Sequence, residues 1–314
     1  MLITRIKNNS IHFYRFCLSL LSLLCICSCA DTTSDNVFTI LTTTSILADT
    51  VRNIVKEDAS VVSLMGPGID PHTYQTTQKD VKKLTHADII FYNGLYLEGK
   101  MSDLLGKIAE NRKVYAVGDA LDPRQLIYDA AVFPLGVDPH IWFNIKLWKE
   151  IVAFISSKLQ EARPESAVYY QRNTAVYLEA LEVLHQEVTR QIRSIPKAQR
   201  VLITAHDAFG YFGRAYDIEV KGLQGVSTVS ECGLQDIHHI VQLILERNIK
   251  AVFFETSVSD KSMRAVLEGC SHYGYKVKMG GSLYSDALDE SNTPAGTYCG
   301  MIQANTKAIV NALK

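Results

Sequence analysis

The sequence predicts an α/β fold with two lobes, each built on a four-stranded, mostly parallel sheet, joined by one long backbone helix. In both halves of the chain, short apolar runs typical of buried strands alternate with segments of helical periodicity. Between the halves, residues 163–193 contain no glycine and carry leucine, valine and isoleucine at helical spacing. A chain of 314 residues is long enough for two domains with sizeable cores.

Residues 1–28 are expected to form a signal peptide that is not part of the fold. Three basic residues precede a leucine-rich run from Phe16 to Ile26, and small residues follow it. This run is shorter than the roughly 20 apolar residues that a membrane-spanning helix needs. The tetrapeptide Ile26-Cys27-Ser28-Cys29 resembles a bacterial lipobox, which would make Cys29 a lipidated N-terminus; the alternative is ordinary cleavage nearby. The protein is therefore expected in the periplasm or at the outer face of the cytoplasmic membrane.

Residues 29–36 read as a polar spacer, and residues 37–160 are expected to form the first lobe. Its most apolar run, Ala87–Tyr92, is typical of a strand buried on both faces of a sheet. The sequence predicts strands at 38–41, 59–65, 87–92 and 113–117, alternating with helices at 46–55, 78–84 and 100–109.

The connecting helix is expected within residues 161–197. Pro164 falls in its first turn, where proline is tolerated, and Pro196 stops it. At about 1.5 Å per residue, residues 163–193 give a rod of roughly 46 Å. The alternative is a pair of helices broken near Arg172–Thr174.

Residues 198–314 are expected to form the second lobe, in which the alternation of strand and helix returns. The sequence predicts strands at 200–204, 219–223, 250–255 and 275–279, with helices at 234–247, 260–270 and about 298–313.

Charge and cysteine content argue against several classes of protein. Without the three basic residues of the signal peptide the formal charge falls from −1 to −4, so neither nucleic acid nor an anionic membrane surface is an expected partner. No C-x-x-C metal pair occurs. Cys232, Cys270 and Cys299 are too scattered for a disulfide framework. One disulfide among them and three buried thiols both remain open.

A duplicated pentapeptide is the most specific signal in the chain. Gly68-Ile69-Asp70-Pro71-His72 recurs as Gly136-Val137-Asp138-Pro139-His140. Both copies lie in turn-rich connections, where glycine and proline fix the backbone and aim one imidazole. Histidine is the commonest transition-metal ligand, and a nearby carboxylate often orients its second nitrogen. His72 and His140 are therefore candidate metal ligands, and Asp70 and Asp138 are candidates to orient them.

Two more candidate ligands stand where predicted strands end. His206 follows the first strand of the second lobe, and Asp286 follows the last one, with Asp289 as a nearby competitor. Because ligands of open parallel sheets bind at the carboxyl ends of the strands, these side chains are expected near one binding site.

The segments around these positions resemble the TroA-type (cluster A-I) metal-binding solute-binding proteins of ABC importers. The resemblance implies two lobes joined by one long helix, with a metal held in the cleft between them. It assigns His72, His140, His206 and Asp286 as the metal ligands. The matching segments are D-P-H-x-Y at 70–74, D-P-H-x-W-F at 138–143, T-A-H-D-A-F-G-Y-F at 204–212, K-G-L-Q-G at 221–225 and S-D-A at 285–287.

The identity of the metal stays open at this point. Zinc-dedicated relatives often carry a histidine-rich loop after the first lobe, whereas residues 119–137 contain no histidine. Manganese-dedicated relatives usually have a carboxylate as the third ligand, and this chain has His206. Three imidazoles and one carboxylate suit zinc and would also accept manganese or ferrous iron.

The resemblance implies a metal receptor outside the cytoplasmic membrane rather than an enzyme. The protein is expected to be a monomer that carries one ion to an ABC permease. Two rivals are a secreted zinc hydrolase, with water at the fourth metal position, and a surface adhesin that uses metal only to hold its shape. Against the hydrolase, the chain has no H-E-x-x-H motif, and no obvious glutamate stands beside the proposed ligands as a general base.

Overall fold

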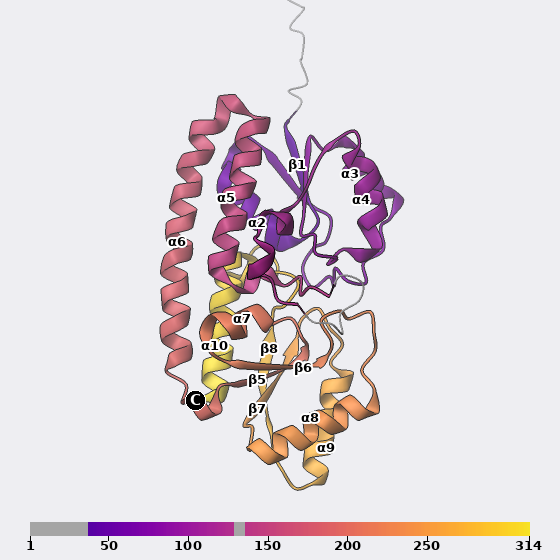
Figure 1. Ribbon diagram of the computed structural model, residues 1–314, viewed down its shortest axis with the longest axis vertical. Helices are drawn as coiled ribbons and strands as arrows, with labels where there is room; N and C mark the ends of the chain where they lie inside the picture. The colour runs from indigo at the N-terminus through magenta and orange to yellow at the C-terminus, as the bar shows by residue number, and fades with distance from the viewer. Residues whose placement is uncertain (1–36, 129–135) are drawn as a thin grey trace, which may run out of the picture. The chain divides into compact units, whose positions relative to one another are not determined.

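A four-stranded parallel sheet occupies the first half of the chain (Figure 1), in a computed structural model that describes residues 37–128 and 136–314. The strand order is β2-β1-β3-β4, so the two most apolar strands lie in the centre, where Ile40 and Ile90 are fully buried. All four predicted strands and three predicted helices of this half are confirmed: β1 (Thr39–Thr42), α2 (Ser45–Val55), β2 (Ser60–Ser63), α3 (Gln78–His86), β3 (Ile89–Tyr92), α4 (Ser102–Ala109) and β4 (Lys113–Ala116).

Polar caps fix where the helices of this half begin. The hydroxyl of Thr44 accepts a hydrogen bond from the backbone N–H of Leu47 and starts α2 directly after β1. Thr77 and Asp80 form a capping box at the start of α3, in which each side chain bonds the other residue's backbone N–H. Both helices are therefore anchored at the carboxyl edge of the sheet.

Two long helices follow, α5 (Ile145–Ala162) and α6 (Ala167–Arg193), separated by a short 3-10 turn that begins at Pro164. Helix α6 runs unbroken through Arg172–Thr174, so the prediction of a single long helix is confirmed and the broken pair is wrong. Helix α6 begins at Ala167, later than predicted, because Pro164 starts the 3-10 turn that precedes it. Helix α6 packs along α2, α5 and the last helix, α10 (Tyr298–Leu313) (Figure 1).

The second half contains two pairs of parallel strands. Strand β5 (Val201–His206) pairs with β6 (Glu219–Gln224), and β7 (Ala251–Glu255) pairs with β8 (Lys278–Leu283). The β5 and β7 strands lie side by side, so the four predicted parallel strands are present, with ladder hydrogen bonds inside each pair. The helices of this half are α7 (Gly210–Tyr216), α8 (Leu234–Arg247) and α9 (Lys261–His272).

Two elements of the second half differ from the prediction. Helix α7 was not expected, because seven residues interrupted by two glycines carry too little periodicity. Strand β8 lies later than the predicted 275–279, because Gly280 and Gly281 conceal the strand pattern there. Its pairing with β7 also shifts register between Val252 and Phe254.

The largest hydrophobic cluster joins residues from both halves of the chain. It includes Ile40 of β1, Trp148 of α5, Leu181 of α6, Phe253 of β7 and Met301 of α10, all of them essentially inaccessible to solvent. The chain from Phe38 to Lys314 accordingly forms one compact unit. The strands of the two halves are thus held by a shared apolar core on the side of the long helices.

Cys232, Cys270 and Cys299 are free thiols, so the alternative of a disulfide among them is wrong; only Cys270 is fully buried.

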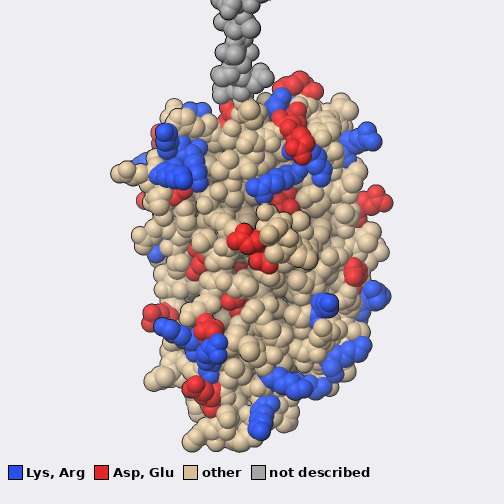
Figure 2. Space-filling model, turned by 180° about the vertical axis from the view of Figure 1, so that it is seen from behind, with Lys and Arg blue, Asp and Glu red and all other residues tan. Residues whose placement is uncertain are grey.

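Basic and acidic side chains are interspersed on the face in Figure 2. Within the described ranges, every helix is too short or too polar to cross a bilayer. The predicted signal peptide, the spacer and Cys29 lie outside the described residues.

Candidate metal centre

The four predicted ligands meet in one buried cluster. One ligand atom from each of His72, His140, His206 and Asp286 lies within 4.8 Å of the others, and all four residues are buried. The Nε2 atom of His140 lies 3.3 Å from that of His72 and 3.4 Å from that of His206. The carboxylate of Asp286 lies 3.5 Å from the Nε2 atom of His140 and 3.6 Å from that of His206.

His72 is placed by the turn that follows β2. Gly68 has a φ of +66°, a conformation that glycine adopts without strain. The Oδ1 atom of Asp70 accepts a hydrogen bond from the backbone N–H of His72 at 2.8 Å, and its Oδ2 atom accepts one from the hydroxyl of Thr228 at 2.6 Å. Asp70 therefore shapes the backbone of His72, where the sequence had suggested that it orients the ring.

His140 is oriented as the sequence predicted. The Oδ1 atom of Asp138 lies 2.8 Å from Nδ1 of the His140 ring and accepts a hydrogen bond from the backbone N–H of His140 at 2.9 Å. The hydroxyl of Tyr211 donates to the backbone carbonyl of Asp138 at 2.9 Å. Further along, the indole N–H of Trp142 donates to the carbonyl of Ser285 at 2.9 Å. The segment that carries His140 is thereby tied to the segment that carries Asp286.

His206 ends β5, and its partner was missed by the sequence analysis. The Oε1 atom of Glu255 accepts the backbone N–H of His206 at 2.8 Å, and its Oε2 atom lies 2.6 Å from the ring Nδ1. Glu255 is the last residue of β7, the strand beside β5. A glutamate thus lies beside one of the clustered histidines, where its carboxylate contacts the backbone N–H and lies close to the ring. The available signal was an acidic residue closing a buried strand at the edge where ligands bind.

Asp286, rather than Asp289, completes the cluster. Its Oδ2 atom accepts a hydrogen bond from the hydroxyl of Ser257 at 3.0 Å. The carboxylate of Asp289 instead accepts hydrogen bonds from the hydroxyls of Tyr284 and Thr293, both at 2.9 Å, and is not part of the cluster. The carboxylate that lies in the cluster is therefore that of Asp286.

The electrostatics of the cluster favour positive charge on two of its histidines. Burial opposes protonation of His140, but the carboxylates of Asp138 and Asp286 outweigh it and raise its pKa to about 9. Burial also opposes protonation of His206, and here Glu255 and Asp286 raise the pKa well above its ordinary value. In the absence of metal, these carboxylates therefore favour the protonated form of both rings.

The remaining two residues behave differently. Burial lowers the pKa of His72 to about 3, and the attraction of Asp286 does not compensate. Burial works to raise the pKa of Asp286, but the neighbouring His206 and His140 hold it well below its ordinary value. His72 is therefore neutral and Asp286 ionised at every pH near neutrality.

The donor set fits a divalent transition metal. The Oδ1 atom of Asp286 is buried and has no hydrogen-bond partner within the described part of the chain. An unpartnered buried carboxylate oxygen is costly unless a cation is near it. Three imidazole nitrogens and one carboxylate oxygen form a set that zinc, manganese and ferrous iron accept.

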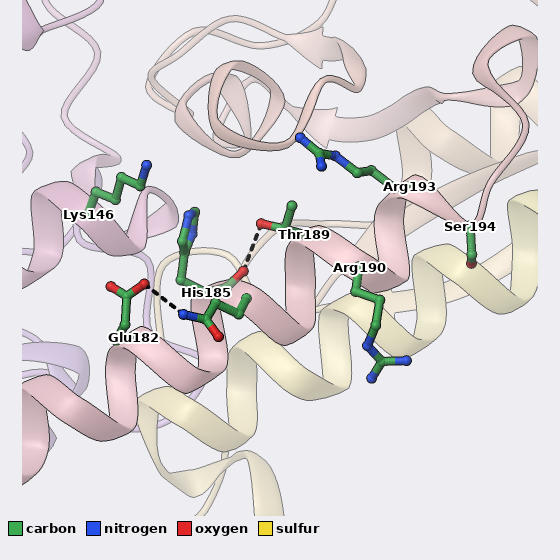
Figure 3. A pocket seen from close by; sticks show the side chains of 8 residues that line it. Lys146, Glu182, His185, Thr189, Arg190, Arg193 and Ser194 are labelled. Atoms are coloured by element: carbon green, nitrogen blue, oxygen red, sulfur yellow. Dashed lines mark hydrogen bonds between the residues drawn. The ribbon is translucent and has the colours of Figure 1, made fainter.

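A separate surface hollow of about 640 Å³ lies along α6 (Figure 3) and contains none of the four clustered residues. Glu182 accepts a hydrogen bond from the side chain of Gln186 and forms an ion pair with Lys149. The Nδ1 atom of His185 lies 3.2 Å from the hydroxyl of Tyr216. Its polar groups thus serve local contacts. The hollow is lined by Lys146, Glu182, His185, Gln186, Thr189, Arg190, Arg193 and Ser194.

Three curated proteins are similar to the chain over nearly its whole length. The manganese-binding lipoprotein MntA of Bacillus subtilis is 46% identical over 289 residues, which cover 91% of this chain and 92% of that protein. The zinc-binding protein TroA of Treponema pallidum is 41% identical over 284 residues, with 90% and 91% covered. SloC of Streptococcus mutans, a metal ABC transporter substrate-binding lipoprotein, is 30% identical over 303 residues, with 95% and 96% covered.

The fold of the chain is also similar to that of a solved relative. The solved structure of the periplasmic zinc-binding protein TroA from Treponema pallidum matches with a TM-score of 0.84 at 40% identity, covering 88% of this chain and 98% of that one. The family model described as "Zinc-uptake complex component A periplasmic" matches residues 40–312. The TroA-type resemblance of the sequence motifs is therefore confirmed, and the chain belongs to this zinc-uptake component A (ZnuA) family of periplasmic metal-binding proteins.

Proposed function

We propose that the protein captures one divalent transition-metal ion with His72, His140, His206 and Asp286 and delivers it to an ABC permease in the cytoplasmic membrane. The observation that carries the proposal is the convergence of these four buried side chains on one point. Two of them come from the first half of the chain and two from the second. We propose that residues 37–160 and 198–314 act as the two metal-binding lobes and residues 161–197 as their connector.

The arrangement supports a carrier better than a hydrolase. A catalytic zinc site keeps one position for water, with three protein ligands, whereas four protein side chains meet here. Glu255 could be suggested as a general base, but both of its oxygens face His206, one the backbone N–H and one the ring. A carrier needs only to replace the hydration shell of the ion, and the protein is proposed not to be an enzyme.

The donor set favours zinc, with manganese and ferrous iron as alternative cargoes. Neutral imidazole is a good ligand for zinc, and tetrahedral sites with histidine and carboxylate are usual for it. Manganese prefers more oxygen ligands, although a relative with 46% identity is named for manganese. Elemental analysis of protein purified from its native compartment would name the ion.

We further propose that residues 1–28 are removed on export, that residues 29–36 act as a spacer and that Cys29 is lipid-modified, which would tether a monomeric receptor to a membrane near the permease. Relatives named as lipoproteins support the anchor. Mass spectrometry of the native N-terminus decides it, because an unmodified N-terminus elsewhere would exclude lipidation. Sedimentation of the mature protein tests the monomer.

The proposed function is tested by binding and transport together. Calorimetric titration should give one equivalent of zinc or manganese, and His206→Ala should weaken binding at least tenfold because the ion keeps part of its hydration shell. His185→Ala, which changes a histidine outside the cluster, is the matched control. Cells that lack the protein should lose uptake of radiolabelled metal. Normal uptake would favour the surface adhesin, and unchanged affinity in His206→Ala would remove that residue from the site.

A further inference from the structure

The chain leaves β3 through a left-handed turn at Gly94, Leu95 and Tyr96. Their φ angles are 75°, 52° and 65°. Leucine and tyrosine rarely adopt such angles, because Cβ then crowds the following carbonyl oxygen. Strained backbone of this kind persists only where its surroundings hold it, and it is common at functional sites. Two consecutive residues of this type therefore call for a functional explanation.

The neighbours of the turn leave room for it. A Cβ atom at Gly118 would lie 2.7 Å from Cγ of Leu95, and one at Gly99 would lie 2.6 Å from the ring of Tyr96. Both distances are shorter than real contacts, so the turn packs against positions where only glycine fits. Leu95 and the ring of Tyr96 thus pack closely on these two glycines, while Tyr96 stays 46% exposed.

A buried carboxyl group clamps the start of the turn. Glu98 is only 2% exposed and accepts the backbone N–H groups of Asn93 and Gly94, at 2.8 and 3.2 Å. It also accepts the hydroxyl of Thr43 at 2.6 Å. The left-handed turn is what brings Glu98 back to the residues just before it. Together they fix the backbone at Asn93.

Asn93 connects this clamp to the metal site. Its side chain is buried, and its Nδ2 atom donates to the carbonyl oxygen of Pro139 at 3.0 Å. The same carbonyl accepts the backbone N–H of Ile141 at 2.8 Å. Pro139 directly precedes His140, so this hydrogen bond acts on the peptide from which the proposed ligand begins.

We infer that Asn93 is a positioning residue for His140: the left-handed turn and Glu98 hold its amide against the Pro139 carbonyl, which fixes where the His140 ring stands. Asp138 then sets the rotation and tautomer of that ring. This inference rests on the proposed metal-binding function. It assigns a role to the residue directly after β3, whose side chain donates hydrogen bonds to the carbonyls of Gly94 and Pro139 rather than to the four clustered side chains.

Two substitutions test the inference in the purified full protein. Asn93→Ala removes the amide, and Asn93→Asp keeps its size but replaces the donating NH₂ group with an oxygen that faces the carbonyl. Zinc affinity is measured by competition with a chelator, and the visible absorption of bound Co²⁺ reports the coordination geometry. Zinc affinity should fall by about 10- to 100-fold in both variants, with a changed Co²⁺ spectrum and the larger effect in Asn93→Asp.

Matched variants separate positioning from general destabilisation. Asn173 on α6 makes the same kind of contact, from Nδ2 to the carbonyl of Ile54 at 2.8 Å. Asn173→Ala should lower the melting temperature but leave zinc affinity and the Co²⁺ spectrum unchanged. Gly118→Ala leaves Asn93 itself in the sequence. The added methyl group should push Leu95 aside and so change the Co²⁺ spectrum.

The inference would be overturned if the folded Asn93 and Gly118 variants kept the zinc affinity and the Co²⁺ spectrum of the unmodified protein. A failure of the unmodified protein to bind either zinc or Co²⁺ would instead overturn the proposed function, and this inference with it.

Discussion

The ring Nδ1 atom of His206 lies 2.6 Å from Oε2 of Glu255, while Oε1 of the same carboxylate accepts the backbone N–H of His206 at 2.8 Å. One side chain therefore fixes both the backbone and the ring of a proposed ligand. The negative charge of Glu255 favours a proton on Nδ1, which leaves the Nε2 lone pair for the metal once that nitrogen is deprotonated. The carboxylate also makes the imidazole a stronger donor.

Glu255→Leu should weaken zinc binding by about 10- to 100-fold, because the ring loses both its orientation and its basicity. Glu255→Gln should have a smaller effect, since its amide oxygen can still lie beside Nδ1 but carries no charge. Glu219 on β6, which forms a surface ion pair with Arg247, offers the control variant Glu219→Gln. Chelator competition measures all three affinities. Equal affinities for the Glu255 variants and the control would show that the carboxylate does not tune the site.

The close approach of Gly210 to Asp138 gives a second prediction. A Cβ atom at Gly210 would lie 2.8 Å from Oδ2 of Asp138, and this buried carboxylate cannot move without losing its contacts to His140. Gly210→Ala is therefore expected to weaken metal binding about tenfold or more. Gly106→Ala, in the open middle of α4, is the matched control and should raise helix stability by roughly 0.5–1 kcal/mol. Normal zinc affinity in Gly210→Ala would mean that Asp138 can shift freely.

The sequence located the four clustered residues because each has a local signal. The duplicated pentapeptide pointed to His72 and His140 without any knowledge of the fold. His206 and Asp286 follow predicted strands, where ligands of parallel sheets are expected. The order of the strands was not needed for these assignments, since the carboxyl ends of all parallel strands lie at one edge.

What the sequence could not provide depends on contacts between distant segments. Glu255 interacts with His206 only because β7 lies beside β5, and neighbouring strands are not encoded in local pattern. Asp70 and Asp138 occupy the same place in the repeat, yet only Asp138 contacts the ring of its histidine, since Asp70 is also engaged by Thr228 from the other half of the chain. Tertiary packing decides between such equivalent positions.

Metal should stabilise the protein strongly, because it binds a site that exists only in the folded chain. At a free zinc concentration of about 1,000 times the dissociation constant, the free energy of unfolding should rise by about 4 kcal/mol. Removing the metal with a chelator should reverse this gain. Denaturant unfolding with and without zinc measures it. Asp286→Asn should lose most of the gain, whereas Asp289→Asn should keep it, since Asp289 lies outside the cluster. If Asp289→Asn lost the gain and Asp286→Asn kept it, Asp289 would be the metal ligand instead of Asp286.

Metal binding should release protons, and the structure indicates how many. Below its pKa of about 9, His140 is protonated in the metal-free protein, and the raised pKa of His206 favours the same state. The metal needs the Nε2 lone pair of each ring, so binding at pH 7.5 should displace about two protons. His72, with a pKa of about 3, and the already ionised Asp286 should release none.

The direction of the pH dependence follows from these protons. As the pH falls below about 9, affinity should drop by up to about two decades per pH unit where both rings are protonated. Three histidines with the ordinary pKa near 6.5 would instead hold the metal unchanged down to about pH 7. Calorimetry at pH 7.5 in buffers of different ionisation enthalpy counts the protons, and affinities between pH 6 and 9 give the slope. Release of no protons at pH 7.5 would mean that Asp138, Glu255 and Asp286 do not hold these two rings in their charged form.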